Sequence, residues 1–163
     1  MITLVLGGAR SGKSELAERL VVRSGQTVTY VATGVATDED MAARITAHKA
    51  RRPTTWQTVE VGRDLAGTVA ALPGSVLVDS LGTWLAGLDQ FVADFAALAA
   101  ALAARAGDTI VVSDEVGLGV HPSSALGRTF RDALGQLNRV VADHADEVLL
   151  VVAGRVVRLE EMV

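Results

Sequence analysis

The sequence of 163 residues contains no cysteine, only three prolines, and few aromatic residues, which make up 4 % of the chain. The missing cysteines exclude disulfides and thiolate metal sites. With so few rings, a core must be built from Ala, Val and Leu, and half of all residues are hydrophobic. This length is typical of one domain with a proper core, so we expect a single domain over residues 1–163.

Long apolar runs and an excess of basic residues are also missing. The longest apolar run, residues 95–104, is half a membrane span and is flanked by Asp94 and Arg105. The first apolar segment ends at glycines after six residues, which does not fit a signal peptide. The net charge of −4, from 15 basic and 19 acidic residues, disfavours non-specific DNA binding. We therefore expect a cytoplasmic protein with no membrane span and no nucleic-acid partner.

Apolar strands alternate with helical patterns along nearly the whole chain, which predicts an α/β fold with a mainly parallel sheet and helices on both faces. Strands are expected at residues 2–6, 27–32, 57–61, 75–79, 109–113, 148–153 and 156–159. Helices are expected at residues 15–23, 37–50, 64–72, 91–106 and 124–143. Gly154 and Arg155 separate the last two strands and predict a C-terminal β-hairpin.

One glycine-rich segment follows the first strand and fills the pattern G-x-x-x-x-G-K-[ST] without a mismatch. Its residues are Gly7, Gly8, Ala9, Arg10, Ser11, Gly12, Lys13 and Ser14. Glycines let the backbone wrap a phosphate and aim N–H donors at it, and the following helix adds its positive dipole end. Lys13 would reach the β- and γ-phosphates and the Ser14 hydroxyl would bind Mg²⁺. The alternative is a glycine-rich turn with an incidental Gly-Lys-Ser.

Carboxylates follow two of the expected core strands. Asp79 ends the strand at 75–79, and Asp114 with Glu115 ends the strand at 109–113. The carboxyl ends of parallel strands form the edge where ligands bind in open α/β sheets, so Asp79 is a candidate metal ligand. Each of the three residues could also be a plain helix cap or loop charge, and for Asp114 and Glu115 both interpretations stay open.

A histidine among cations is the second unusual feature. On a helix, Arg44, Arg51 and Arg52 would share one face with His48. Nearby cations favour the neutral imidazole, which is a nucleophile, and guanidinium groups can hold phosphate oxygens in a fork. This combination suits attack on a nucleotide phosphorus. The alternative is a solvated basic face that carries His48 by chance.

Six segments together resemble the bifunctional adenosylcobinamide kinase / adenosylcobinamide-phosphate guanylyltransferase family of cobalamin biosynthesis. They cover essentially the full length in order: GGARSGKS (7–14), YVATG (30–34), DMAARITAHKARRPTTW (40–56), EVGLGVHP (115–122), FRDALGQLN (130–138) and ADEVLLVVAG (145–154). The resemblance implies phosphorylation of adenosylcobinamide by ATP or GTP, then transfer of GMP from GTP to the new phosphate. It also implies a RecA-like P-loop fold, Mg²⁺ as cofactor and a homotrimer.

The resemblance further implies roles for individual residues. His48 would carry GMP covalently, and Lys13 would act in catalysis beside it. Beyond the eight residues of the glycine-rich segment, the implied nucleotide contacts are Ala32, Thr33, Gly34, Lys49, Ala50, Arg51, Arg52, Glu60 and Asp79.

The chain departs from the family pattern in three places. Asp79 stands where many members have glutamate, Asp114 stands where many have asparagine, and residues 81–90 match weakly. Two other functions fit the glycine-rich segment: a kinase for a different small alcohol, which needs no His48, and a regulatory module that uses a nucleotide as a switch.

Overall fold

A computed structural model of the chain describes residues 1–34, 39, 43, 46, 49–50 and 52–162. The strands are β1 (Ile2–Gly7), β2 (Val28–Ala32), β3 (Gln57–Glu60), β4 (Ser75–Asp79), β5 (Thr109–Asp114), β6 (Glu147–Val152) and β7 (Arg155–Leu159). The helices are α1 (Lys13–Val21), α3 (Leu65–Ala71), α4 (Leu81–Ala86), α5 (Phe95–Ala103) and α6 (Ala125–Ala142), with 3₁₀ turns η1 (Val22–Ser24) and η2 (Asp89–Phe91).

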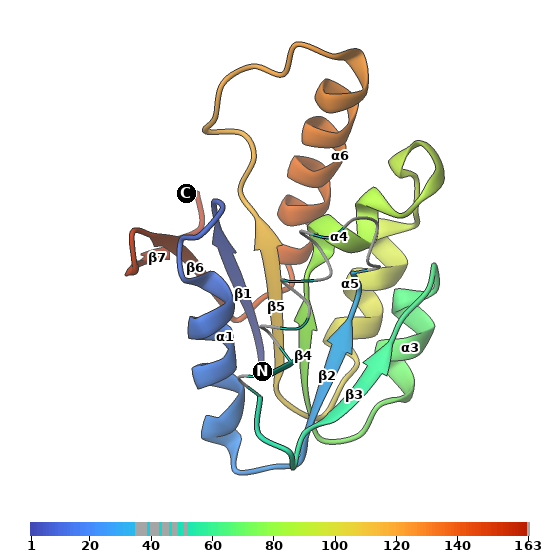
Figure 1. Ribbon diagram of the computed structural model, residues 1–163. Coiled ribbons are helices and arrows are strands. Elements are labelled where there is room, and N and C mark those ends of the chain that lie inside the picture. The colour runs from blue at the N-terminus through green and yellow to red at the C-terminus, as the bar shows by residue number, and fades with distance from the viewer. Residues whose placement is uncertain (35–38, 40–42, 44–45, 47–48, 51, 163) are drawn as a thin grey trace.

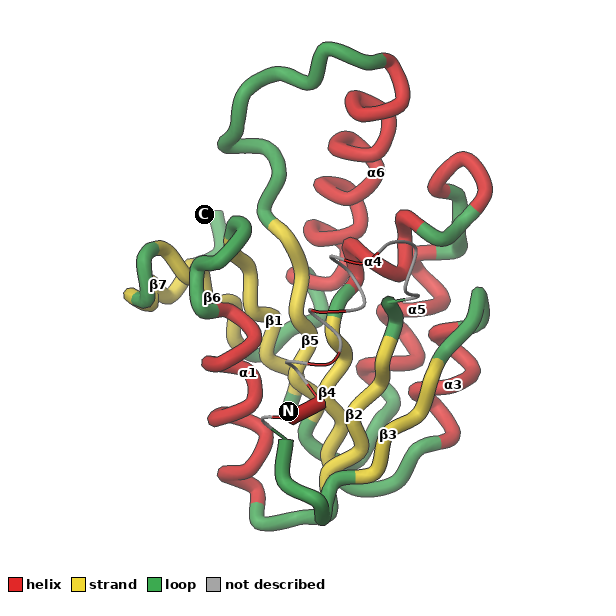
Figure 2. The backbone as a smooth tube through the Cα atoms, in the orientation of Figure 1, coloured by secondary structure: helices red, strands yellow, loops and turns green. Residues whose placement is uncertain are grey.

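These strands form one seven-stranded sheet in the order β3-β2-β4-β5-β1-β6-β7. All neighbouring strands run parallel except β6 and β7, which are antiparallel and form the C-terminal hairpin (Figures 1 and 2). The expected α/β fold, with a mainly parallel sheet, flanking helices and a terminal hairpin, is therefore confirmed.

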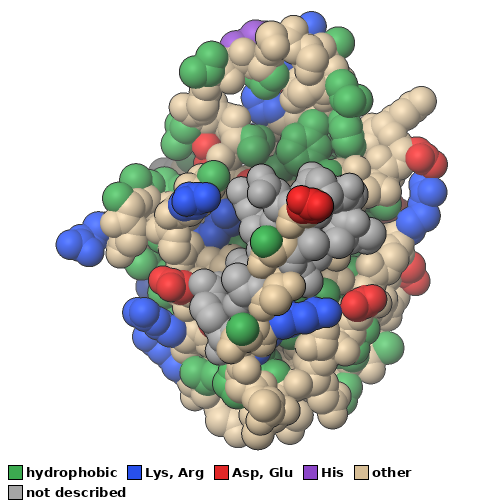
Figure 3. Space-filling model, in the orientation of Figure 1, with side chains coloured by type: hydrophobic (Ala, Val, Ile, Leu, Met, Phe, Trp, Pro, Cys, Tyr) green, Lys and Arg blue, Asp and Glu red, His purple; other side chains and the backbone are tan. Residues whose placement is uncertain are grey.

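Two hydrophobic clusters hold helices to the two faces of the sheet. One cluster packs α3, α4, α5 and α6 against one face, around residues such as Leu4, Val78 and Val111. The other packs α1 against the opposite face, where Tyr30 and Leu77 lie beside aliphatic side chains. Neighbouring residues of a strand alternate between the two clusters, as the period of two requires. The face that carries α1 shows basic and acidic side chains interspersed (Figure 3).

Side-chain caps explain where several helices begin. Asp64, Asp94 and Ser124 each accept a hydrogen bond from the backbone N–H three residues later, which satisfies one of the free donors at a helix start. The helix expected at residues 91–106 is shorter than predicted, because the Asp94 cap starts it at Phe95.

One helix, α4, was not expected. Ser80 caps it in a capping box with Thr83, and Gly82 lies inside it. The helix expected over residues 37–50 lies largely outside the described residues. Among the residues described here, no helix combines the length and the apolar character needed to cross a membrane.

Candidate functional site

The glycine-rich segment Gly7–Ser14, here called the phosphate cup, connects the carboxyl end of β1 to the first turn of α1. Gly12 caps this helix with a φ of 97°, in the left-handed region that favours glycine. Arg10 also has a positive φ, of 57°. A strand, a tight loop and a helix N-terminus thus follow one another as the motif predicts, and the first turn of such a helix has free N–H groups of the kind that bind anions.

Position 7 has no room for a side chain, so glycine is required there. The C-terminal hairpin also braces the cup. A Cβ at Gly7 would lie 2.5 Å from Ser11 Oγ and 2.8 Å from the carbonyl oxygen of Val151 in β6. The Gly154 N–H, at the hairpin turn, donates to the Ser11 carbonyl at 2.9 Å. Ser11 itself is buried, and within the described part of the chain its hydroxyl meets no hydrogen-bond partner. The β6–β7 hairpin therefore braces the cup at both Gly7 and Ser11.

Lys13 reaches back across the cup. Its Nζ donates to the Gly8 carbonyl at 3.2 Å and forms an ion pair with Asp114 Oδ1 at 2.9 Å. Asp114 is available there because β5 pairs with β1 in a register that sets Asp114 beside Gly7. Asn138 of α6 holds this strand end: its Nδ2 donates to the Asp114 carbonyl and its Oδ1 accepts from the Ser113 hydroxyl.

A row of strand ends extends from the cup to the far edge of the sheet. Ala32 of β2 is in register with both Asp79 of β4 and Glu60 of β3. Residues in register on parallel strands share a face, and here that face is the one covered by α1, because Tyr30 and Leu77, two positions earlier, belong to its cluster. Four strand spacings separate β1 from β3, roughly 19 Å.

Tyr30 joins two predicted site residues. Its hydroxyl donates to Asp79 Oδ2 at 2.9 Å, and the guanidinium carbon of Arg52 lies 3.3 Å from the centre of its ring. Burial, and then the negative charge of Asp79, raise the pKa of the Tyr30 hydroxyl above its ordinary value, so it remains a proton donor. Arg52 is half-buried, and no acceptor for its Nε lies among the residues the structure places.

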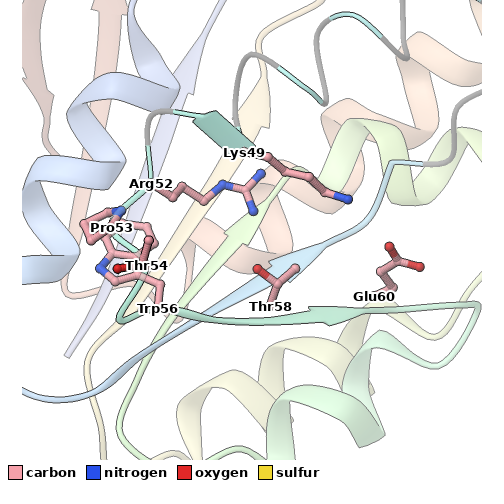
Figure 4. A pocket seen from close by; sticks show the side chains of 7 residues that line it. All are labelled: Lys49, Arg52, Pro53, Thr54, Trp56, Thr58 and Glu60. Atoms are coloured by element: carbon pink, nitrogen blue, oxygen red, sulfur yellow. The ribbon is translucent and has the colours of Figure 1, made fainter.

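A pocket of about 490 Å³, here called the edge pocket, opens over β3. It is lined by Lys49, Arg52, Pro53, Thr54, Trp56, Thr58 and Glu60. Lys49 and Glu60 extend towards the same end of this pocket, whereas Trp56 and Pro53 close the other end (Figure 4). It therefore offers an apolar wall, two cations and a carboxylate, a set suited to a flat polar ring that carries phosphate.

Two predicted residues use their side chains within the protein. The Thr33 hydroxyl donates to the Ser80 carbonyl and accepts from the Ser80 N–H, both at 2.8 Å, so it ties β2 to the start of α4. The Glu115 carboxylate accepts from the N–H groups of Gly117 and Leu118, which is the loop role left open by the sequence. Gly34 lies beside Thr33, and Lys49 and Ala50 are exposed.

The candidate nucleophile belongs to the part of the chain that the structure does not describe. His48 and Arg51, together with Arg44, lie outside the described residues.

Mg²⁺ prefers hard oxygen ligands and usually keeps several waters and substrate phosphates. Ser14 in the first turn of α1 and Asp79 at the end of β4 supply an oxygen each on the same face of the sheet. Within the described ranges, no cluster of three or more His, Cys, Asp or Glu side chains forms a metal cage. The donor set fits a Mg²⁺ ion that is held largely by nucleotide phosphates.

Two residues of this region were missed by the sequence analysis. Tyr30 alternates with apolar residues in β2 and therefore looks like a core residue. Asn138 lies in α6, far along the chain from the strand end it holds. Both act through hydrogen bonds to residues at least 24 positions away, which no local pattern indicates.

Comparison with known proteins agrees with this geometry. Residues 3–159 match the family described as cobinamide kinase / cobinamide phosphate guanyltransferase. The bifunctional adenosylcobalamin biosynthesis protein CobP of Pseudomonas aeruginosa is 42 % identical over 163 residues, covering 94 % of both chains. The bifunctional adenosylcobalamin biosynthesis protein CobU of Salmonella typhimurium is 37 % identical over 182 residues, covering 98 % of this chain and 100 % of its own.

A solved structure of a Pyrococcus horikoshii protein is similar in fold alone. It superposes with a TM-score of 0.54 over 96 % of this chain and 84 % of its own, at 9 % sequence identity.

Proposed function

Because the chain belongs to the cobinamide kinase / cobinamide phosphate guanyltransferase family, we propose that it carries out two consecutive reactions on one nucleotide site. It phosphorylates the aminopropanol hydroxyl of adenosylcobinamide with ATP or GTP. It then transfers GMP from GTP to the new phosphate through a covalent guanylyl-histidine, giving adenosylcobinamide-GDP. The observation that carries this proposal is the pairing of a preformed phosphate cup with the edge pocket, along one row of strand ends.

In the kinase step, the acceptor hydroxyl oxygen bonds to the γ-phosphorus as the bond to the β–γ bridging oxygen breaks. The nucleoside diphosphate leaves and the hydroxyl proton passes to solvent. The N–H groups of the cup and the Lys13 ammonium would neutralise charge on the phosphate oxygens. The carboxylate of Asp114, which Lys13 contacts at 2.9 Å, would compete with the phosphates for this ammonium.

In the guanylyl step, a ring nitrogen of neutral His48 bonds to the α-phosphorus and pyrophosphate leaves. A phosphate oxygen of the corrinoid then attacks the same phosphorus, and the phosphorus–nitrogen bond breaks. Arg51 and Arg52 would hold phosphate oxygens during both attacks. Glu60 in the edge pocket would accept hydrogen bonds from the guanine edge, while Lys49 would meet the nucleotide on the same side.

Mg²⁺, held by Ser14 and Asp79 together with the substrate, would supply charge neutralisation at the β- and γ-phosphates. The partners that we propose are a small-molecule corrinoid and the nucleotide, in the cytoplasm. The homotrimer also remains a proposal, supported by the resemblance alone, and sedimentation equilibrium measures it.

The decisive experiment incubates the protein with [α-³²P]GTP and Mg²⁺ and then denatures it. We expect a protein-bound label that is acid-labile and base-stable, as for a phosphorus–nitrogen bond, and that is lost in His48→Ala. The same variant should still phosphorylate adenosylcobinamide. Label on His48→Ala would refute the assignment of the nucleophile. Phosphorylation of the corrinoid without any adduct in the wild type would favour a kinase that lacks guanylyl transfer.

A further inference from the structure

Tyr30 is the only tyrosine in the chain, and it touches a residue from each half of the proposed site. We propose that Tyr30 is a positioning residue with two separable functions. Its hydroxyl orients the carboxylate of Asp79, the proposed Mg²⁺ ligand, and its ring face supports the Arg52 guanidinium in the edge pocket. This inference rests on the proposed function, because it assigns a role within the same nucleotide site.

The hydroxyl function follows from the hydrogen bond to Asp79. With Oδ2 accepting from Tyr30 at 2.9 Å, the carboxylate is fixed in rotation at the end of β4. Tyr30 is 4 % exposed, so its own rotamer is locked by packing against the cluster under α1. A ligand carboxylate held by a rigid hydrogen-bond donor binds a metal more tightly than a free one, and loss of such a partner typically costs ten- to a hundredfold in affinity.

The ring function follows from the stacking of Arg52. Its guanidinium lies 3.3 Å from the ring centre, and the same side chain lines the edge pocket. A cation over an aromatic face is attracted by the ring quadrupole, and a planar guanidinium stacks where an ammonium does not. The stack therefore holds Arg52 flat against β2 and leaves the pocket open for a nucleotide.

Two substitutions separate the functions. Tyr30→Phe removes the hydroxyl and keeps the ring, whereas Tyr30→Leu removes both. Asp79→Asn and Arg52→Lys disturb the two partners individually. Leu77→Val is the matched control, because Leu77 lies beside Tyr30 in register and in the same cluster, and its aliphatic side chain can neither donate a hydrogen bond to Asp79 nor stack on Arg52 through a ring. Thermal unfolding of each variant reports the purely structural effect.

The test uses two binding titrations rather than turnover. Calorimetry with GTP in EDTA gives a metal-free Kd, which depends on Arg52. The GTP complex is then titrated with Mg²⁺ and, separately, with Mn²⁺ followed by electron paramagnetic resonance. The metal concentration at half-saturation, here called the metal midpoint, should depend on Asp79. For Tyr30→Phe we expect the metal midpoint to rise about tenfold with the metal-free Kd nearly unchanged. For Arg52→Lys we expect the reverse pattern, a Kd weaker by roughly tenfold with the metal midpoint unchanged.

Tyr30→Leu should show both defects, and Tyr30→Phe combined with Asp79→Asn should show no more than Asp79→Asn alone. Leu77→Val should lower Tm and move neither titration. The inference is overturned if Tyr30→Phe leaves the metal midpoint unchanged, or if every variant, including Leu77→Val, weakens both titrations in proportion to its Tm. Should Tyr30→Leu fail to fold, Tyr30→Phe and Arg52→Lys still decide the outcome. A wild type that binds GTP but forms no adduct refutes the guanylyl transfer and leaves this test intact.

Discussion

The phosphate cup and the edge pocket are built differently, although the row of strand ends that starts at the cup reaches the pocket at Glu60. The cup is one contiguous stretch braced by β5 and the terminal hairpin, and the groups that it would offer a phosphate are mostly backbone N–H donors. The edge pocket is assembled from side chains on a segment before β3 and on β3 itself, at the open edge of the sheet.

This difference predicts that the cup and the edge pocket recognise different parts of the nucleotide. A cup made of backbone recognises any triphosphate, because phosphates are common to all nucleotides. A pocket made of side chains recognises what differs between nucleotides, namely the base. Both reactions should therefore depend on the cup, whereas guanylyl transfer should depend more strongly on the edge pocket.

Lys13→Ala gives the largest expected effect and would reduce both reactions. Loss of one preorganised positive group at a reacting phosphate typically costs about 10²–10³ in kcat. Separate assays with ATP for phosphorylation and with GTP for adduct formation measure the two steps.

Glu60→Gln is the comparison variant from the edge pocket. It should weaken selection of GTP over ATP by roughly tenfold, since one charged acceptor of a paired contact is lost, and leave ATP-dependent phosphorylation almost intact. Full kinase turnover by Lys13→Ala, or an equal loss of both steps in Glu60→Gln, would break the proposed division.

The same contrast explains what the sequence could predict. The cup was predicted residue by residue, because strand, glycines, lysine and helix are neighbours in the chain. Asp79 and Asp114 were expected at the ligand-binding edge because parallel strands end at a common edge, and the structure places both at strand ends, the role of Asp114 having been left open. The tie from Tyr30 to Asp79 spans 49 positions, so it became visible only in the folded chain.

Secondary structure was predicted where the apolar period was strong, and was missed where local signals conflicted. In α4 the cap is Ser80, but the third helical residue is Thr83 rather than the Glu or Gln of the usual signature, and Gly82 is a poor helix former. At η2, Gln90 and Phe91 take positive φ values, so a helix could not continue through them towards α5.

Gly7→Ala tests whether the cup is as rigid as its bracing indicates. The added Cβ would meet Ser11 Oγ and the Val151 carbonyl at 2.5 and 2.8 Å, and the second of these is backbone of β6. We expect a loss of about 1–3 kcal/mol in the free energy of unfolding, measured in urea. Gly8→Ala is the stability control, because a Cβ there meets nothing within 4 Å and should change the free energy of unfolding by less than about 0.5 kcal/mol. Equal stabilities of the two variants would mean that the hairpin yields easily.

Asp114→Asn has the smallest expected effect and addresses the carboxylate that lies beside Lys13. The Asp114 carboxylate pairs with Lys13 at 2.9 Å, and their side chains are 34 % and 13 % exposed. A bound triphosphate needs the same ammonium, so the carboxylate competes with it. Partly exposed ion pairs contribute about 0–1 kcal/mol, so removing the charge should tighten nucleotide binding by up to about fivefold.

The competition can be distinguished from a general charge effect. Asp143→Asn removes the same charge at the exposed end of α6, close to the start of β6 and therefore near the amino ends of the parallel strands, whereas the cup lies at their carboxyl ends. It should leave the nucleotide Kd unchanged, whereas the gain in Asp114→Asn should shrink as salt screens the pair. A weaker Kd in Asp114→Asn, together with a higher Mg²⁺ midpoint, would instead make Asp114 a metal-side carboxylate beside Asp79. Asp79 and Asp114 would then both face the metal, and metal binding would replace the ion pair between Asp114 and Lys13.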